Sequence, residues 1–185
     1  MPMEFIETPL QGLYVIKPRI LKDDRGLFTR TFCSNEFAQI GFSQNFVQFN
    51  ESVNLNKGTV RGMHYQNTPF SDAKLIRCTQ GKVWDVIIDI RKNSATFLQY
   101  YSVELSSDNK LSVFIPEGFA HGFQTLEDNS TIIYHHTQYY APDSEGGINF
   151  SDPLIGIKWP AEPVKMSSKD LTYRFINNDF KGIDI

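Results

Sequence analysis

The 185-residue sequence has 41% hydrophobic and 21% charged residues, a composition typical of one compact globular domain over residues 1–185. Its formal net charge is -3, from 18 basic and 21 acidic residues, without a long run of Lys or Arg. This balance argues against general binding to nucleic-acid polymers or to anionic membranes, so any anionic ligand must be met by locally placed cations.

The N-terminal sequence, the lengths of the apolar runs and the cysteine usage point to a cytoplasmic protein. Glu4 and Glu7 stand where a signal peptide would need an apolar core. No apolar run approaches the ~18 residues of a membrane span. Cys33 and Cys78 make neither a disulfide framework nor a metal-ligand spacing, which fits a reduced cytoplasmic protein.

The first predicted helix is short and lies near the N-terminus. Ser34 is placed to cap it, it runs through Ile40, and Gly41 ends it. A second short helix is predicted to open at residues 168–170, close to the C-terminus. Helices are therefore expected only at the margins of the fold.

Between these helices the sequence consists of short segments with alternating apolar residues, which predict β-strands. Residues 82–90 and 100–105 are clear examples. Turn residues separate such segments at roughly the ~8–12-residue spacing of sandwiches and barrels. The turns lie at residues 57–58, 80–81, 107–109 and 142–144.

The number of strands and their spacing predict an all-β fold. About ten short antiparallel strands are expected to form a jelly roll, in which two packed sheets curl into a barrel-like sandwich. Aromatic residues make up 14% of the sequence, which favours strands and aromatic-lined pockets. Small barrels of this kind bind ligands in their interior or mouth.

One strand-like run places Arg61 and His64 three residues apart. On a regular strand the two side chains would face opposite sides, unless Gly62 marks a β-bulge that brings them together. The alternative, a surface arginine and a hydrogen-bonded core histidine, is equally compatible with the local pattern.

A second run carries the spacing Pro116-x-Gly118-x-x-His121, which resembles the second motif of cupin jelly rolls and would direct His121 into the barrel. The first cupin motif would then fall at His64 and Gln66, with only one histidine. A catalytic metal usually needs about three good protein ligands. These residues make a poor set, so we expect no metal.

Without a metal, a histidine in the barrel is a candidate general base, because a free imidazole titrates near neutral pH. His64 is the candidate. The adjacent His135 and His136 point to opposite faces of a strand, so at most one of them joins the same site. Candidate acids are the nearby tyrosines, each of which could instead be a strand aromatic with a bonded hydroxyl: Tyr134, Tyr139 and Tyr140.

Nine short motifs follow one another in fixed order between about residue 23 and residue 170. They occupy residues 24–28, 48–52, 61–66, 74–75, 85–91, 116–123, 152–153, 159–160 and 168–170. Together they resemble the dTDP-4-dehydrorhamnose 3,5-epimerase family. The resemblance implies a cupin jelly-roll homodimer, without metal or organic cofactor, that acts on a nucleotide-diphosphate sugar.

The reaction implied by this resemblance inverts C3 and C5 of a 4-keto-6-deoxyhexose, converting dTDP-4-dehydro-6-deoxy-D-glucose to dTDP-4-dehydro-L-rhamnose. Both carbons flank the C4 carbonyl, so loss of either proton gives an enolate. By matching motif positions, His64 is the base, Asp170 its carboxylate partner, Tyr134 the acid on the opposite face and Lys74 the cation near the enolate oxygen.

The resemblance also implies a set of substrate-binding residues, whose cations suit a diphosphate with about two negative charges. In the family an N-terminal segment crosses to the partner barrel, so that Arg25 and Phe28 would serve the neighbouring site. The implied set is Arg25, Phe28, Gln48, Asn50, Arg61, His121, Tyr140, Glu145 and Lys169.

Three departures from the family pattern leave the substrate open. Arg30 replaces a glutamate in the nucleotide-binding stretch, residues 71–73 replace an Ala-Gln sequence near Lys74, and residues 134–136 read Tyr-His-His in place of Tyr-Lys-Cys. The alternatives are a C3-only or C5-only epimerase, or a ketoisomerase, on a related dTDP-, CDP- or GDP-linked sugar.

Two alternatives belong to other functional classes. A metal-dependent cupin lacks its second histidine here. A non-catalytic sugar-binding cupin would be expected to have lost His64, Asp170 or Tyr134, all of which are present. The resemblance points to a product used to make rhamnose or a related deoxysugar, either for a bacterial surface polysaccharide such as O antigen or for a glycosylated natural product.

Overall fold

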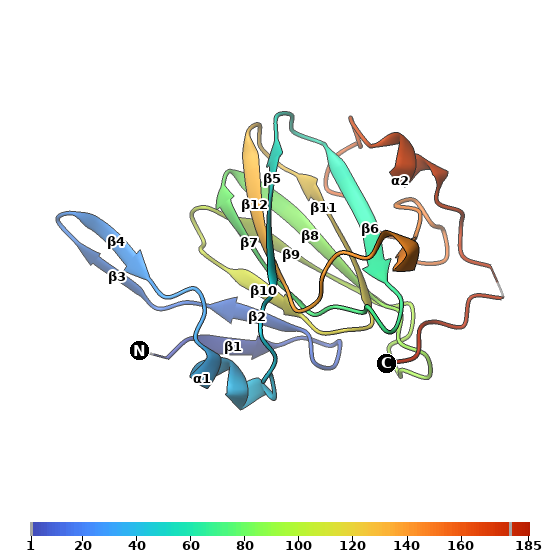
Figure 1. Ribbon diagram of the computed structural model, residues 1–185. Helices are drawn as coiled ribbons and strands as arrows, with labels where there is room; N and C mark the ends of the chain where they lie inside the picture. The colour runs from blue at the N-terminus through green and yellow to red at the C-terminus, as the bar shows by residue number, and fades with distance from the viewer. Residues whose placement is uncertain (1, 178) are drawn as a thin grey trace.

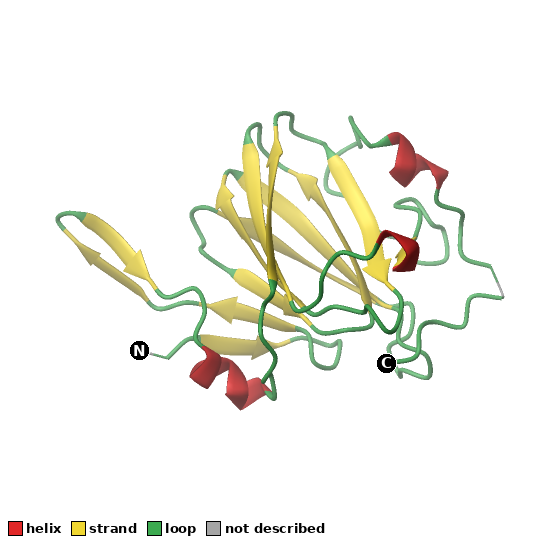
Figure 2. Cartoon of the chain, viewed as in Figure 1, coloured by secondary structure: helices red, strands yellow, loops and turns green. Residues whose placement is uncertain are grey.

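The computed structural model describes residues 2–177 and 179–185. Two antiparallel sheets pack face to face, a separate two-stranded hairpin projects from them, and short helices lie at the periphery (Figures 1 and 2). The prediction of an all-β jelly roll with marginal helices is confirmed.

The first sheet has six strands in the order β1-β2-β10-β7-β12-β5, and every neighbouring pair is antiparallel. Its central strands, β7 and β12, carry several pocket residues. In chain order the strands are β1 Glu4–Glu7, β2 Tyr14–Lys17, β5 Gln48–Asn54, β7 Lys74–Gln80, β10 Ser112–Ile115 and β12 Ser130–His136.

The second sheet has five strands in the order β13-β6-β11-β8-β9, again with antiparallel pairing throughout. The predicted strands at 82–90 and 100–105 are β8 and β9 of this sheet. The strands are β6 Val60–Gln66, β8 Lys82–Asp89, β9 Tyr100–Ser106, β11 Phe119–Thr125 and β13 Glu145–Gly147.

The third sheet is a hairpin of two strands, β3 (Ile20–Asp23) and β4 (Gly26–Thr29). It extends away from the two packed sheets, on the side where β1 and β2 lie (Figure 1). Nearly all its residues are exposed, including the large apolar side chains of Leu27 and Phe28. The hairpin therefore has no core of its own within this chain.

The N-terminal helical segment comprises α1 (Ser34–Phe37) followed by the 3₁₀ helix η1 (Ala38–Ile40). It matches the predicted helix and ends, as expected, at Gly41, whose φ is +79°. The predicted cap differs: Ser34 is the first helical residue, and Cys33 occupies the N-cap position without a side-chain hydrogen bond.

The remaining helices are η2 (Pro142–Ser144) and α2 (Ser168–Thr172). α2 begins where the sequence predicted, and Ser167 caps it by accepting a hydrogen bond from the Asp170 amide at 3.0 Å. Within the described ranges no helix is long and apolar enough to cross a membrane.

The main core lies between the two sheets, where inward-facing residues of both layers meet. Burial of these side chains supplies the largest favourable contribution to folding. The cluster consists of Leu10, Leu13, Ile76, Cys78, Val83, Ile87, Leu105, Val113, Ile115, Phe119, Phe123 and Ile132.

The outer faces of the sheets are covered as well. Val86 and Ile88 of β8 point away from the main core and pack under C-terminal residues such as Ile155 and Ile183. On the other sheet, Phe37 of α1 joins a second apolar cluster. Because both faces of β8 are buried, five of its eight residues are apolar, the exceptions being Lys82, Asp85 and Asp89.

Candidate active site

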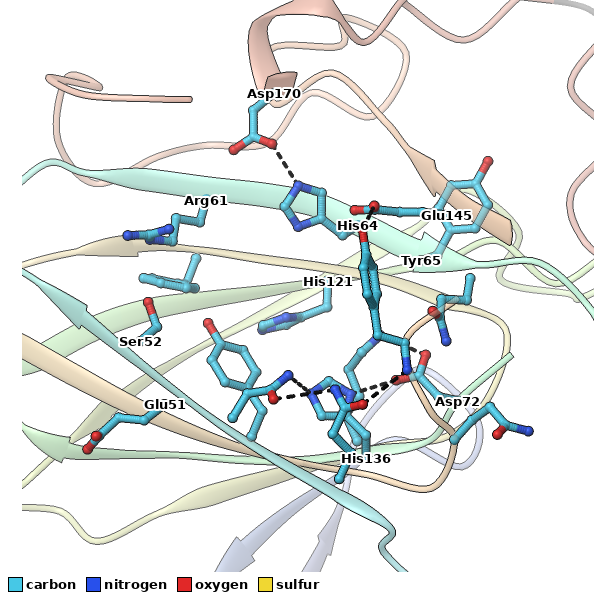
Figure 3. A pocket seen from close by; sticks show the side chains of 18 of the residues that line it. Glu51, Ser52, Arg61, His64, Tyr65, Asp72, His121, His136, Glu145 and Asp170 are labelled. Atoms are coloured by element: carbon cyan, nitrogen blue, oxygen red, sulfur yellow. Dashed lines mark hydrogen bonds and ion pairs between the residues drawn. The ribbon is translucent and has the colours of Figure 1, made fainter. Parts of the chain in front are cut away.

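A cavity of about 360 Å³ is lined by residues from both sheets, from α2 and from β13 (Figure 3). It contains eleven of the thirteen residues to which the family resemblance gives a catalytic or substrate-binding role. Those lining it are Gln48, Asn50, Arg61, His64, Lys74, His121, Tyr134, Tyr140, Glu145, Lys169 and Asp170.

A β-bulge in β6 brings Arg61 and His64 to the same cavity. In the ladder with β11, His64 pairs with His121 and Arg61 pairs with Phe123, so β6 contains one more residue than its partner between these pairs. Gly62, with φ +125°, occupies the bulge. A Cβ there would lie 2.5 Å from the Gly122 Cα, so a larger residue would force the strands apart.

His64 of β6 is bonded to a carboxylate from α2. Its Nε2 lies 2.7 Å from the Asp170 Oδ1. The Gly62 amide lies 3.4 Å from the other Asp170 oxygen. Burial acts to raise the pKa of the Asp170 carboxyl, but hydrogen bonds from His64, Gly62 and Ser167 hold it below its ordinary value. The ionised carboxylate therefore favours a proton on His64 Nε2 and leaves the lone pair on Nδ1.

A second histidine–aspartate pair is more buried than the pair of His64 and Asp170. His121 Nε2 is 2.8 Å from Asp85 Oδ1, and both side chains are buried. Burial raises the pKa of Asp85, and the His121 ring opposes that shift. The other Asp85 oxygen has no hydrogen-bond partner among the described residues. His121 also meets the Tyr134 ring edge-on, at 6.0 Å between centroids.

The opposite wall carries a third pair, joined to a lysine. His136 Nδ1 lies 2.7 Å from Asp72 Oδ2, and Lys74 Nζ lies 3.2 Å from Asp72 Oδ1. Burial acts to raise the pKa of Asp72, but Lys74 and His136 hold it below its ordinary value. Figure 3 shows this pair across the cavity from Asp170 and His64.

Tyr134 is the least exposed of the three candidate acids and packs against the main core. Its ring stacks on His136 at 6.0 Å between centroids and 18° between planes. Burial raises the pKa of its hydroxyl strongly, so the group keeps its proton at neutral pH. Tyr139, in contrast, is exposed and does not line the cavity.

The rim of the cavity holds Tyr140, Glu145 and Lys169. The Tyr140 hydroxyl donates to Glu145 Oε2 at 2.7 Å, and the Lys169 ammonium forms a salt bridge to the same oxygen. Burial acts to raise the pKa of Glu145, but its hydrogen bonds to Lys169 and Tyr140 lower it, while Glu145 raises the pKa of Lys169. A charged pair thus stands at the entrance.

Two predicted binding residues lie outside this cavity. Arg25 and Phe28 are on the β3–β4 hairpin, where Arg25 pairs with Asp23 at 2.6 Å and Phe28 is 65% exposed. The nearby Arg30, which departs from the family pattern, forms a 2.6 Å salt bridge to Glu36. Within one chain, the hairpin does not complete the site.

Several cavity residues escaped the sequence analysis as site residues. Ser52 could have been found by strand alternation, since it shares a face of β5 with Gln48 and Asn50. Asp72 was noted only as a departure from the family pattern, and His136 was also named as one of two adjacent histidines of which at most one would join the site. The residues missed are Glu51, Ser52, Tyr65, Gln66, Asp72, Phe123, His136, Gln138 and Ser167.

Residues 2–177 and 179–185 contain no group of three or more His, Cys, Asp or Glu side chains placed to hold a metal ion. His121, a cupin ligand position, is instead engaged with Asp85.

Fold and cavity define a class: a cupin-type jelly roll whose pocket is lined by imidazole, tyrosine and lysine side chains, which are groups that acid–base enzymes use. The sequence model of the dTDP-4-dehydrorhamnose 3,5-epimerase family matches residues 7–178. The chain therefore belongs to this family and is an isomerase.

Individual relatives support this family assignment. The dTDP-4-dehydrorhamnose 3,5-epimerase of Shigella flexneri is 39% identical over 180 residues, which cover 96% of this chain and 99% of the relative. The structure of dTDP-6-deoxy-D-glucose-3,5-epimerase from Legionella pneumophila Philadelphia 1, in complex with dTDP-4-keto-L-rhamnose, has a TM-score of 0.92 and 38% identity, covering 99% of each chain. A 3'-monoepimerase from Streptomyces bikiniensis, in complex with dTDP-quinovose, has a TM-score of 0.84 and 31% identity, covering 91% of this chain and 85% of that one.

Proposed function

We propose that this protein inverts C3 and C5 of dTDP-4-dehydro-6-deoxy-D-glucose, giving dTDP-4-dehydro-L-rhamnose. One observation carries the proposal: the base candidate His64 and the acid candidate Tyr134 line the same cavity from different sheets. Inversion needs proton removal on one face of a carbon and proton delivery on the other, which groups on two opposing sheets can provide.

The chemistry begins at His64 Nδ1, for which no hydrogen bond is recorded among the described residues. Nδ1 takes the proton from the carbon next to the C4 carbonyl, and the Asp170 carboxylate stabilises the imidazolium through Nε2. Negative charge collects on the C4 oxygen as an enolate. The Lys74 ammonium, beside the cavity, stabilises this oxygen. Tyr134 then delivers a proton from the opposite face.

The nucleotide part of the substrate is bound by the cations and amides of the cavity. Arg61 and Lys169 meet the diphosphate, for which Arg and Lys side chains are the expected partners. Gln48 and Asn50 on β5 supply polar contacts, while His121, Tyr140 and Glu145 complete the binding wall. The ligand named for the Legionella relative, dTDP-4-keto-L-rhamnose, supports this assignment.

The working unit is a cytoplasmic homodimer of a single domain. An isolated two-stranded hairpin is marginally stable in water, yet β3 and β4 expose Leu21, Leu27 and Phe28. Their burial against a second copy would remove this apolar surface from water. Arg25 and Phe28 then reach the partner's cavity and pack against its nucleotide. The free cysteines Cys33 and Cys78 fit a reducing compartment.

Sedimentation equilibrium tests the dimer. The intact chain is expected at twice its 21.2 kDa mass, and Leu27→Asp is expected to shift it toward the monomer. Thr29→Asp is the control with added charge on the same hairpin. A monomeric wild-type chain with full activity would refute the exchange of the hairpin.

A second candidate is a single-site epimerase on a related nucleotide sugar. The fold is shared with the Streptomyces 3'-monoepimerase. In addition, Arg30 is bound to Glu36 where the family pattern has a glutamate, which leaves the nucleotide base open.

Deuterium exchange separates these candidates. The enzyme is incubated in deuterated water with dTDP-, CDP- and GDP-linked 4-keto-6-deoxy sugars, and the product is read by NMR. Deuterium at both C3 and C5 is expected with the dTDP sugar, because each inverted carbon must exchange its proton. Label at only one carbon would select the single-site enzyme, and no label at either would sink the epimerase proposal.

A further inference from the structure

His136 and Asp72 form a polar pair beside Lys74 that the proposed reaction does not use. The three side chains come from adjacent strands: β12 ends at His136, and His136 is the register partner of Lys74, the first residue of β7. Asp72 precedes β7 by two residues. All three line the cavity, although their side chains are only 4–13% exposed.

The two oxygens of Asp72 are occupied by different partners. Oδ1 faces Lys74 Nζ at 3.2 Å, and Oδ2 faces His136 Nδ1 at 2.7 Å. No other acidic side chain lies within 4 Å of Lys74 Nζ in the part of the chain that the structure describes. The direction in which Lys74 points therefore depends on the direction of the Asp72 carboxylate.

The proton on His136 can be assigned from its second neighbour. Asn50 Nδ2, which carries only hydrogens, lies 3.3 Å from His136 Nε2. Asn50 Oδ1 accepts from Gln48 Nε2 at 3.3 Å, which fixes this orientation of the amide. The Asn50 amide thus donates to Nε2, and the proton of the neutral ring stands on Nδ1, where it donates to Asp72.

The backbone holds the pair in register. The Ala73 amide donates to Thr137 Oγ1 at 2.8 Å, and the Thr137 amide donates to the Ala73 oxygen at 3.1 Å. These bonds join the residue after Asp72 to the residue after His136. The carboxylate and the imidazole are consequently fixed relative to one another before substrate binds.

We infer that His136, acting through Asp72, is a positioning residue that holds the Lys74 ammonium toward the reacting oxygen; this rests on the proposed role of Lys74. A buried carboxylate with one oxygen unpaired would turn toward the lysine and take it as its sole partner. The Nδ1–H of His136 satisfies the second oxygen, so the carboxylate keeps its direction and shares its charge. Lys74 remains available to the enolate.

A double-mutant cycle tests this inference. His136→Leu removes the donor to Asp72 and is expected to lower kcat about tenfold with KM within about twofold, as for other outer partners of a catalytic group. In the Lys74→Met background the same change is expected to cost nothing further, because the two residues act as one unit. His135→Leu, on the next residue and the other face, is the matched control with unchanged kcat.

Two amide substitutions of His136 test whether its effect on kcat comes from the hydrogen bond to Asp72 or from packing. Asn reproduces the Nδ1 donor of histidine, whereas Gln places its amide near the Nε2 position. His136→Asn is therefore expected to return kcat to within about threefold of wild type, and His136→Gln to remain as low as His136→Leu. This comparison also decides the question if His136→Leu fails to fold in a thermal melt.

The outcomes distinguish the inference from the function beneath it. Full turnover by Lys74→Met would overturn the role of Lys74 and the inference with it. Low turnover by Lys74→Met, with an equal further loss on adding His136→Leu, would overturn the inference alone. Unchanged kcat in His136→Leu, or no difference between His136→Asn and His136→Gln, would also overturn it.

Discussion

Two histidine–aspartate pairs lie on opposite walls of the cavity. Their nitrogen–oxygen distances are the same, but their exposure and their hydrogen-bond partners differ. His64 lies 2.7 Å from Asp170, and His136 lies 2.7 Å from Asp72. The His64 side chain is 38% exposed, whereas that of His136 is 13% exposed. No hydrogen bond to Nδ1 of the first imidazole is found among the described residues, whereas the second imidazole is bonded at both nitrogens, to Asp72 and Asn50.

The difference shows that residue type alone does not assign a chemical role. An imidazole with one free nitrogen and a carboxylate behind it can accept a proton. An imidazole with both nitrogens engaged cannot do so without breaking a bond, so it orients its neighbours instead. The lysine bonded to the second carboxylate strengthens that division, because it gives Asp72 a cation as a further partner.

We expect the largest effect from a substitution of His64, the proposed base of the first pair. His64→Asn removes the atom that takes the proton, so turnover and solvent exchange at C3 and C5 should fall about 10³-fold. Binding of dTDP, measured by calorimetry, should stay within about twofold, since the partly exposed ring is not a packing residue. Unchanged exchange would assign the base elsewhere.

Tyr134→Phe separates the two half-reactions, because the hydroxyl lies between the walls and delivers the second proton. Inversion should fall about 10²–10³-fold, while exchange of the proton abstracted by His64 continues. NMR in deuterated water measures both rates on one sample. If exchange and inversion fell together by the same factor, the acid role would be wrong.

Asp170→Asn tests the tautomer in the first pair. An amide NH₂ facing His64 Nε2 would favour the proton on Nδ1 and block the base, so kcat should fall about 10²-fold. The ¹⁵N shifts of the His64 ring report the tautomer directly. Loss of activity with the wild-type tautomer retained would contradict this account.

Asp72→Asn breaks the second pair and should lower stability as well as kcat, because it removes the carboxylate that we infer directs Lys74. Removing the buried charge that joins Lys74 and His136 should cost about 3 kcal/mol at pH 7, measured by urea unfolding. The pKa of Asp72 is lowered in the fold. Its stabilisation is therefore complete above the unfolded value of ~3.9 and is lost as pH falls through the lower folded value.

The control for the Asp72→Asn experiment is the same difference in unfolding free energy measured at lower pH. The gap in unfolding free energy between wild type and Asp72→Asn should narrow as the pH is lowered below ~4, because wild type then loses the same charge. A gap that stays constant between pH 7 and pH 3 would mean that the Asp72 charge contributes nothing to the difference.

Local patterns predicted the secondary structure well where local physics decides it. Gly41 ends the first helical segment because glycine adopts positive φ without strain, and β8 was visible as an apolar run. The helix cap was placed one residue late, since Ser34 makes no capping bond and the chain turns at Cys33. Caps depend on local backbone geometry that composition does not encode.

Motif spacing located the first histidine–aspartate pair but not the second. His64 and Asp170 are 106 residues apart, and the family resemblance paired them before their contact was known. Asp72 and His136 are 64 residues apart, and neither belongs to a motif of the resemblance. Only the pairing of β12 with β7 brings these two together. The adjacent histidines were predicted to face opposite sides, and indeed His136 alone of the two lines the cavity.

The sequence by itself determined the fold class, the family and the residue types available for acid–base chemistry, because strand periodicity, turn residues and motif spacing are local properties of the chain. The tertiary structure decided that His64 is bonded to Asp170 through Nε2 while His136 is bonded at both nitrogens, which carboxylate shares its charge with a lysine, and that the bulge at Gly62 turns Arg61 and His64 to one side. These depend on packing and burial between distant segments. Exposure and hydrogen-bond partners, which only the fold supplies, distinguish the pair that we propose as the base from the pair that we propose as a support for Lys74.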